Sequence, residues 1–254
     1  MLLGEIASQH IERKLGIQVD RKLNLGGTLL AHEAIKTGAI DIYPEYTGTA
    51  LTAVLKQAPT NDPAAVFDKV RSEYRKQWSI DWCPPLGFNN TFAMVINKQL
   101  GITSLSEAAN SARFWRVGAG YEFLTRPDGL PGLLKTYPLK IEGSPLTMDL
   151  GLLYSALQNG KVDMVAANST DGMISVLPVI PLRDDKRYFP PYQCSVLVRE
   201  DALRKYAGLR QVVDQLSGRF SDETMRKLNY AVDGEHRSVR EVAAEALSSL
   251  KLDR

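Results

Sequence analysis

Aromatic side chains stand where predicted strands end, and their chemistry is the first sign of a bound ligand. Tyr43, Tyr46, Phe88, Phe92 and Tyr192 all fall at strand ends or in the loops that follow. Because ring faces carry negative potential, a group of such rings suits a quaternary ammonium head, which cannot donate hydrogen bonds. Aromatic residues at strand ends also serve as plain packing, so their spacing alone leaves both interpretations open.

Three polar residues could bind an anionic group. Arg126 lies in a loop rich in proline and glycine and could hold a carboxylate in a bidentate fork, with Thr49 adding a neutral donor. Thr28 is placed to cap the helix expected over 29–37, where free backbone N–H groups make an anion site plausible. The alternatives are a surface arginine and an ordinary helix cap.

Catalytic chemistry finds little support in the sequence. His10, His32 and His236 fall on expected helices and pair with no reactive serine or cysteine, which indicates surface or core roles. A phosphate-binding loop, a dinucleotide-binding glycine pattern and metal-ligand spacing are all missing. We therefore expect a protein that is not an enzyme and that uses neither a cofactor nor a metal.

The two cysteines, Cys83 and Cys194, are too few for a disulfide scaffold. Each lies beside a stretch that we assign to the ligand site. They are either two unlinked small core residues or a bridge that ties two hinge strands together, and the bridge would imply an oxidising compartment.

Composition excludes several classes of protein. Among 254 residues, 44% are apolar and 24% charged, which is globular usage, and the length suits one large domain or two lobes. A net charge of +2, from 31 basic and 29 acidic residues, leaves no strong field of either sign. Because no basic run with interleaved aromatics occurs either, nucleic acid is a poor candidate partner. No stretch approaches the roughly 18 apolar residues of a membrane helix.

An internal repeat organises the elements that must position these side chains. The stretch Ala34–Asp41 (AIKTGAID) recurs at Ala156–Asp163 (ALQNGKVD), an offset of 122 positions. Each copy has the pattern of a helix end, a glycine C-cap and a short apolar strand. At the same offset, position 46 (Tyr46) corresponds to position 168 (Asn168). This pattern predicts two similar α/β halves whose strand-end loops face one another across a crevice.

Periodicity and turn signals predict the remaining elements. The expected helices cover 2–15, 29–37, 48–56, 64–77, 105–112, 148–159 and most of 201–254, and the expected strands cover 18–23, 39–43, 79–83, 92–97, 115–119, 139–142, 162–166 and 193–199. An α/β domain that opens on a helix suggests that a first strand is missing, and the missing piece could include a secretion signal.

Two apolar strands, 92–97 and 193–199, bracket a middle segment with its own strands and helices. We therefore expect lobe I to contain 1–97 plus 194–254 and lobe II to contain 98–193, joined by two crossovers. Such a chain closes like a hinge on a ligand between its lobes.

Several motifs in this order resemble a known family. LGGTLLAHEAIKTGAIDIYPEYTGTAL, GFNNTFAM, EFLTRPDGLPGL, STDG and DDKRYFPPYQCSVLVRE are together similar to the substrate-binding proteins of osmoprotectant ABC importers, which take up glycine betaine, choline, carnitine and related compounds. The resemblance covers nearly the whole chain. It implies a type II periplasmic-binding-protein fold of two lobes, with an aromatic cage for trimethylammonium and an Arg plus Thr clamp for carboxylate.

Carried over by motif, the resemblance implies cage positions at Tyr46, Phe92, Asn168 and Tyr192, and carboxylate positions at Thr49 and Arg126. Two positions depart from the family, which usually has tyrosines in the cage. Phe92 keeps the ring without the hydroxyl, and Asn168 has no ring. The family's N-terminal strand motif, of the Ser-Lys-x-Phe-Thr-Glu type, is also absent, so the anion clamp and the first sheet are expected to be incomplete.

The resemblance implies a periplasmic or other extracytoplasmic protein, expected to be a monomer, that closes on a betaine-like zwitterion and delivers it to an ABC permease. The alternative is a sensory or permease-fused domain of the same fold that binds another small solute. An enzyme on the same scaffold is a third possibility, against which stands the lack of a nucleophile and base pair.

Overall fold

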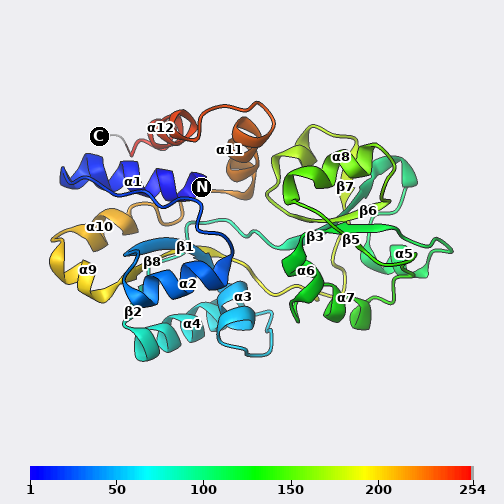
Figure 1. Ribbon diagram of the computed structural model, residues 1–254, viewed down its shortest axis with the longest axis horizontal. Helices are drawn as coiled ribbons and strands as arrows, with labels where there is room; N and C mark the ends of the chain where they lie inside the picture. Colours follow the sequence, from blue (N-terminus) through cyan, green and yellow to red (C-terminus); the bar gives the residue numbers. More distant parts are fainter. Residues whose placement is uncertain (253–254) are drawn as a thin grey trace. The chain divides into compact units, whose positions relative to one another are not determined.

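The computed structural model describes residues 1–252, which fold into two compact units (Figure 1). The first unit comprises Met1–Asn89 and Pro191–Arg254, and the second comprises Asn90–Pro190. These boundaries differ from the ones expected from the sequence, which placed 92–97 in lobe I. That strand pairs with the strands at 164–168 and 179–181, both in the second unit, and its ladder therefore assigns it there.

The first unit is built on a three-stranded antiparallel sheet in the order β1-β8-β2. Its strands are β1 (Ile42–Tyr46), β2 (Ile80–Trp82) and β8 (Cys194–Arg199). Its helices are α1 (Leu2–Leu15), α2 (Thr28–Thr37), α3 (Thr47–Thr49), the π-helix η1 (Ala50–Val54), α4 (Pro63–Trp78), α9 (Glu200–Lys205), α10 (Leu209–Asp214), α11 (Asp222–Asp233) and α12 (Val239–Ser249).

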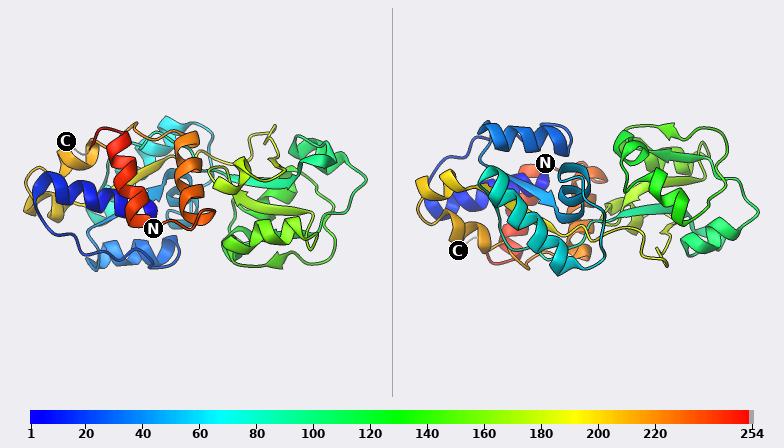
Figure 2. Two further views of the ribbon diagram at one scale, coloured as in Figure 1. Left: turned by 90° about the horizontal axis from the view of Figure 1, so that it is seen from above. Right: turned by 90° about the horizontal axis from the view of Figure 1, so that it is seen from below.

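Helices cover both faces of this sheet (Figure 1). On one face, alternate residues of β8 such as Val196 and Val198 pack against α1, α10 and α12. On the other face, Leu197 of β8 and Tyr43 of β1 pack against α2 and α4. The left view of Figure 2 shows α12 crossing over α1, the helix pair that closes the first core.

Helix α4 shows how directly the local sequence specifies this unit. The Asp62 side chain accepts from the N–H groups of Ala64 and Ala65, and Pro63 occupies the first helical turn, as the sequence predicts. Val66, Val70 and Tyr74, four residues apart, are fully buried on one face.

The second unit contains a five-stranded mixed sheet in the order β5-β4-β6-β3-β7. Its strands are β3 (Phe92–Asn97), β4 (Val117–Ala119), β5 (Leu146–Thr147), β6 (Met164–Asn168) and β7 (Val179–Pro181). Its helices are the short 3-10 turns η2 (Lys98–Leu100), η3 (Leu150–Leu152) and η4 (Gly172–Ser175), with α5 (Leu105–Asn110), α6 (Tyr121–Thr125), α7 (Leu130–Thr136) and α8 (Leu153–Gln158). Helix α8 covers one face of the sheet, against Val95 and Val165.

The internal repeat is reproduced in backbone hydrogen bonds. In the first unit the N–H groups of Ala39 and Ile40 both donate to the carbonyl of Ala34. At the same offset, the N–H groups of Lys161 and Val162 both donate to the carbonyl of Ala156. Gly38 and Gly160 have φ angles of 76° and 66°, the left-handed conformation that a glycine C-cap requires. The predicted similarity of these two supersecondary units is confirmed.

Two predicted strands, 18–23 and 139–142, are wrong as continuous strands. Residues 18–23 belong to no strand, and of 139–142 only Ile141 forms an isolated bridge, with Trp115. Both segments have the residue pattern of a strand, but neither forms a full ladder of hydrogen bonds with a neighbouring strand. The helix expected over 148–159 begins with a 3-10 turn and becomes α-helical only at Leu153. No helix within residues 1–252 is long and apolar enough to cross a membrane.

Candidate functional site

The start of α3 lies against the segment that precedes β8 in the first unit. The Thr47 N–H donates to the carbonyl of Gln193 at 3.0 Å, and the Thr47 hydroxyl donates to the carbonyl of Pro191 at 3.1 Å. The same hydroxyl accepts from the N–H of Gln193 at 3.2 Å. These bonds hold the loop after Tyr46 beside the chain that carries Tyr192.

Gly48 makes this approach possible. A Cβ at this position would lie 2.7 Å from the carbonyl oxygen of Pro191 and 2.8 Å from Cδ1 of Tyr192. Thr49, the next residue, is 5% exposed, and Tyr192 is 2% exposed with its N–H donating to Asn89 Oδ1 at 2.7 Å. The structure therefore brings Tyr46, Thr49 and Tyr192 into one neighbourhood of the first unit.

Tyr46 is half-buried at the end of β1, and its ring meets Phe88 edge-on with 6.3 Å between centroids. Its N–H donates to Oε1 of buried Glu45 at 2.8 Å, and Oε2 of Glu45 accepts from the Tyr43 hydroxyl at 3.1 Å. Burial, reinforced by the Glu45 charge, raises the pKa of Tyr43 well above its usual value. Tyr43 and Phe88 are buried in the core, so these two rings have the packing role that the sequence left open.

In the second unit, Phe92 and Asn168 are direct cross-strand partners on β3 and β6. The adjacent pair exchanges a hydrogen bond, from the N–H of Ser169 to the carbonyl of Thr91, so Phe92 and Asn168 form a non-hydrogen-bonded pair. Side chains at such pairs approach most closely. The two positions that depart from the family cage are therefore immediate neighbours.

Arg126 lies against the Phe92 ring, with 5.2 Å from its Cζ to the ring centroid. Its guanidinium also makes a bidentate pair with Asp128, with Nε donating to Oδ1 at 2.9 Å and Nη2 donating to Oδ2 at 2.5 Å. The Asp128 side chain is 1% exposed and that of Arg126 is 11% exposed. A charged pair this deeply buried fixes the guanidinium plane.

Sequence reasoning missed three aromatic residues around Phe92. The Phe92 ring meets Phe123 at 5.0 Å and Phe189 at 6.1 Å between centroids, and Tyr188 meets Phe189 at 5.0 Å. The Tyr188 hydroxyl shares its one proton between the carbonyls of Pro127 and Gly129, at 3.1 and 3.0 Å, which braces the loop that carries Arg126. The signal was present, because Phe123 belongs to the EFLTRPDG motif and the other two to KRYFPP.

The loop after Asn168 is held by carboxylate and amide groups. The N–H of Asn168 donates to Oδ2 of Asp171 at 3.1 Å, and the Tyr154 hydroxyl donates to the same oxygen at 3.1 Å. The Thr170 hydroxyl donates to Asn90 Oδ1 at 2.7 Å. Asp163 forms a bidentate pair with Arg116.

The predicted cap at Thr28 is wrong. Gly27, in an extended conformation, is the N-cap of α2, and Thr28 is the first helical residue. The helix begins one residue earlier than the sequence suggests, and no side chain caps its start. The role of Thr28 in anion binding at this helix start stays a prediction.

Cys83 and Cys194 are free thiols in the core of the first unit. Burial raises the pKa of Cys83 to about 12 and that of Cys194 well above its usual value. Both therefore behave as small apolar core residues in this structure, the first of the two alternatives considered.

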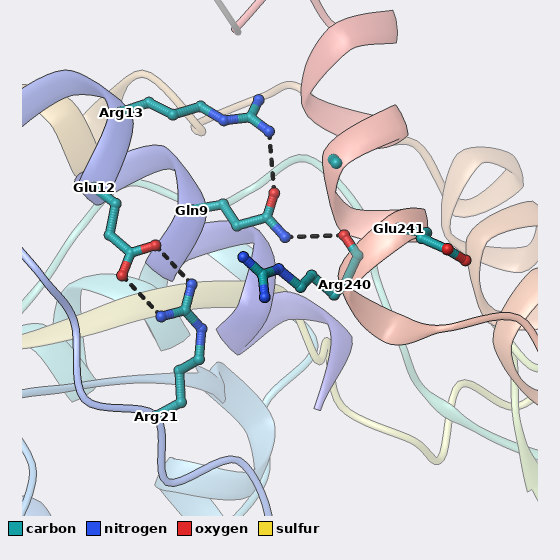
Figure 3. A pocket seen from close by; sticks show the side chains of 7 residues that line it. Gln9, Glu12, Arg13, Arg21, Arg240 and Glu241 are labelled. Carbon is teal, nitrogen blue, oxygen red and sulfur yellow. Dashed lines mark hydrogen bonds and ion pairs between the residues drawn. The ribbon is translucent and has the colours of Figure 1, made fainter.

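A polar surface pocket of the first unit contains none of these site residues (Figure 3). Arg21 donates to Oε1 and Oε2 of Glu12 and to Glu5, and hydrogen bonding by Arg21 lowers the pKa of Glu12 to about 2. Gln9 Nε2 donates to the carbonyl of Arg240, joining α1 to α12. In this pocket, the ion pairs of Arg21 with Glu5 and Glu12 hold the segment after α1 against that helix.

Two α/β units, each with aromatic and polar residues at strand ends, define the class of two-lobed periplasmic-binding-protein folds. A solved structure titled "Crystal structure of glycine betaine/carnitine/choline ABC transporter" matches with a TM-score of 0.84 and 30% identity, over 100% of this chain and 95% of that one. The apo YehZ structure from Escherichia coli matches with a TM-score of 0.74 and 27% identity, over 99% of this chain and 94% of that one.

Residues 1–249 match the family described as "Substrate binding domain of ABC-type glycine betaine transport system". The chain belongs to this family of non-enzymatic solute-binding proteins of ABC importers, which bind small molecules and work with permeases.

Two curated relatives support the assignment. The ergothioneine transport permease/ergothioneine binding protein EgtU of Helicobacter pylori is 34% identical over 99% of this chain and 46% of its own length. The carnitine transport binding protein OpuCC of Listeria monocytogenes is 31% identical over 97% of this chain and 82% of its own length. The chain thus spans about half of the Helicobacter relative.

Proposed function

We propose that the residues that bind a betaine-like zwitterion include Tyr46, Thr49, Phe92, Arg126, Asn168 and Tyr192. The observation that carries the proposal is the arrangement around Phe92. A ring, a fixed guanidinium 5.2 Å from its centroid and an amide directly across the strand pair lie together. These groups match a ligand with a quaternary ammonium group, a carboxylate and one further polar group.

The names of the relatives narrow the ligand class. They are described as binding ergothioneine, carnitine and glycine betaine, compounds that share a trimethylammonium group and a carboxylate. Asn168, an amide in place of a ring, favours a ligand whose head group carries a hydrogen-bonding atom near the ammonium. We therefore propose a functionalised betaine in preference to glycine betaine itself.

We further propose that the protein works as a monomer outside the cytoplasm and delivers its ligand to an ABC permease. A second candidate is a ligand-binding domain fused to its permease or serving a sensory system. The favouring observation is that the chain matches only 46% of the Helicobacter relative, whose name includes both permease and binding protein. Full-length gene sequence distinguishes the two arrangements, because a fusion encodes membrane spans in the same polypeptide.

Isothermal titration calorimetry of the purified protein tests the ligand class. The panel is glycine betaine, choline, carnitine, proline betaine and ergothioneine. We expect the tightest binding from a betaine that carries an additional hydrogen-bonding group. Silence across the panel from folded protein would refute the betaine proposal.

Two alanine variants test the site in separate units. Tyr46→Ala and Phe92→Ala should each weaken a trimethylammonium ligand by about 2- to 30-fold, the loss of one cation–π contact of about 0.5–2 kcal/mol. Tyr121→Ala is the control for the second unit because Tyr121 is 70% exposed. Unchanged affinity in both test variants would show that these rings only pack.

A further inference from the structure

The likeness between the two units extends past the strand ends into the loops that follow them. At the offset of 122 positions, Thr47 corresponds to Ser169. The Thr47 N–H donates to the carbonyl of Gln193, and the Ser169 N–H donates to the carbonyl of Thr91. In each unit the acceptor is the residue just before the long apolar strand, β8 or β3. The backbones of the two loops are therefore equivalent up to this point.

Two residues further on, the loops differ in what they hold. Thr49 corresponds to Asp171 at the same offset. Oδ2 of Asp171 accepts from the N–H of Asn168, so this carboxylate holds the strand end of the second unit. In the first unit the equivalent N–H, that of Tyr46, donates to Glu45. The strand end of the first unit thus depends on a residue of the strand itself, and the loop residue at position 49 keeps its side chain for other contacts.

The turns that follow differ as well. In the second unit the N–H of Ile174 donates to the carbonyl of Asp171, three residues back, in the 3-10 helix η4. In the first unit the N–H of Leu55 donates to the carbonyl of Ala50, five residues back, at the end of the π-helix η1. A π-helical turn is wide and rare, and it occurs frequently at functional sites. The first unit has this widened turn directly after Thr49.

Thr52, in the middle of the π-helix, bonds back to the loop. Its hydroxyl donates to the carbonyl of Gly48 at 2.8 Å, and the residue is 4% exposed. At the offset, Thr52 corresponds to Ile174, which has no hydroxyl, so this bond is particular to the first unit. Because a peptide group is planar, a fixed Gly48 carbonyl also fixes the N–H and the Cα of Thr49.

Gly48 is confined from its other side too. An added Cβ would lie 2.7 Å from the carbonyl oxygen of Pro191 and 2.8 Å from Cδ1 of Tyr192, so the backbone of Gly48 already lies close to both. The Thr52 hydroxyl therefore holds a peptide that cannot move toward Tyr192. The direction of the Thr49 side chain follows from the orientation of that peptide.

We propose that Thr52 is a positioning residue for carboxylate recognition. Through the Gly48 carbonyl, its hydroxyl sets the direction in which the Thr49 side chain meets the carboxylate of the ligand. This role rests on the proposed function, in which Thr49 is one of the residues that bind the ligand. Because Thr52 acts through Thr49, loss of its hydroxyl weakens ligands that carry a carboxylate and leaves ligands without one unchanged.

Calorimetry with carnitine, which carries a carboxylate, and choline, which does not, tests this proposal. Thr52→Val removes the hydroxyl and nearly keeps the shape of the side chain. We expect the dissociation constant of carnitine to rise by about 3- to 12-fold, the effect of one misaligned hydrogen bond, and that of choline to stay within about twofold. Thr52→Ser restores the hydroxyl and should bind carnitine within about twofold of the parent.

Thr37→Val is the matched control. The Thr37 hydroxyl makes the same kind of bond, to the carbonyl of Glu33 at 2.9 Å, on an exposed turn of α2, so neither ligand should bind differently. In a Thr49→Val background, adding Thr52→Val should cause no further loss of carnitine affinity, because residues that act through one another are not additive. If Thr52→Val does not fold, Thr52→Ala gives the same reading.

Four outcomes would overturn the positioning role. They are equal losses for carnitine and choline, unchanged binding of both, failure of Thr52→Ser to restore carnitine binding, and additive losses in the double variant. Each leaves the proposed function intact, because the parent protein still binds carnitine. A folded parent that binds neither ligand refutes the proposed function, and the role of Thr52 with it.

Discussion

Restoring a ring at position 168 should tighten the binding of a simple trimethylammonium ligand. Asn168 is the direct, non-hydrogen-bonded partner of Phe92, so the side chain of Asn168→Tyr would project beside the Phe92 ring. One added cation–π contact contributes about 0.5–2 kcal/mol, which corresponds to about a 2- to 30-fold lower dissociation constant. Asn168 is half-exposed, so the larger side chain has room to extend.

Calorimetry with a charged and a neutral ligand separates the electrostatic effect from contact area. Choline carries the trimethylammonium group, and 3,3-dimethylbutanol has the same shape without the charge. We expect Asn168→Tyr to tighten choline and to leave the neutral compound within about twofold. Asn110→Tyr, at the exposed end of α5, is the matched control and should change neither.

Two outcomes would refute this reasoning. Equal tightening of both compounds would mean that the new ring adds apolar contact only. Weaker choline binding by a folded variant would mean that the Asn168 amide contacts the ligand directly, and that its loss outweighs the gained ring. The second outcome would still place residue 168 in the site.

Three further predictions concern stability. Gly48→Ala should lower the free energy of unfolding by about 1–3 kcal/mol in urea titrations and weaken ligand binding, because the new Cβ overlaps Tyr192. Asp128→Asn should lower the free energy of unfolding by about 1–3 kcal/mol, since it leaves its buried arginine partner with a weaker acceptor. The control Glu223→Gln, which removes a charge from an exposed ion pair, should change the free energy of unfolding little. Equal losses in the two variants would contradict the argument. Burial lowers the pKa of His32 to about 4, so the unfolded chain binds more protons than the folded chain between pH 4 and 6.5. The free energy of unfolding therefore decreases as the pH is lowered through that window. His32→Phe should lose less stability than the parent between pH 7 and 4.5, and an equal loss would assign the acid sensitivity to other groups.

The parts of the fold that follow from local chemistry could be predicted from the sequence. Gly38 and Gly160 must adopt positive φ after their helices, and Asp62 with Pro63 specifies the start of α4. The repeat predicted two similar supersecondary units, and both units make matching backbone bonds to the carbonyls of Ala34 and Ala156. These features depend on residues close in the chain, so composition and spacing contain enough information.

Features that depend on distant partners could not be predicted in the same way. The pattern of residues 18–23 is that of a strand, but a ladder needs a neighbour, and the described chain supplies none. Arg126 was expected to be a free fork for carboxylate, and its pairing with buried Asp128 emerges only from the folded loop. The ring cluster around Phe92 joins residues about a hundred positions apart, which no periodicity connects.

The two strand ends show how ligand choice could vary without loss of the fold. At Tyr46 the backbone N–H is held by the carboxylate of Glu45, and at the equivalent Asn168 by that of Asp171. Neither bond uses the side chain of residue 46 or 168. Because the loop direction is fixed by the backbone, a ring can be exchanged for an amide at this position at little structural cost. Ligand selectivity is therefore expected to reside in the side chains at 46 and 168, and stability in the carboxylates beneath them.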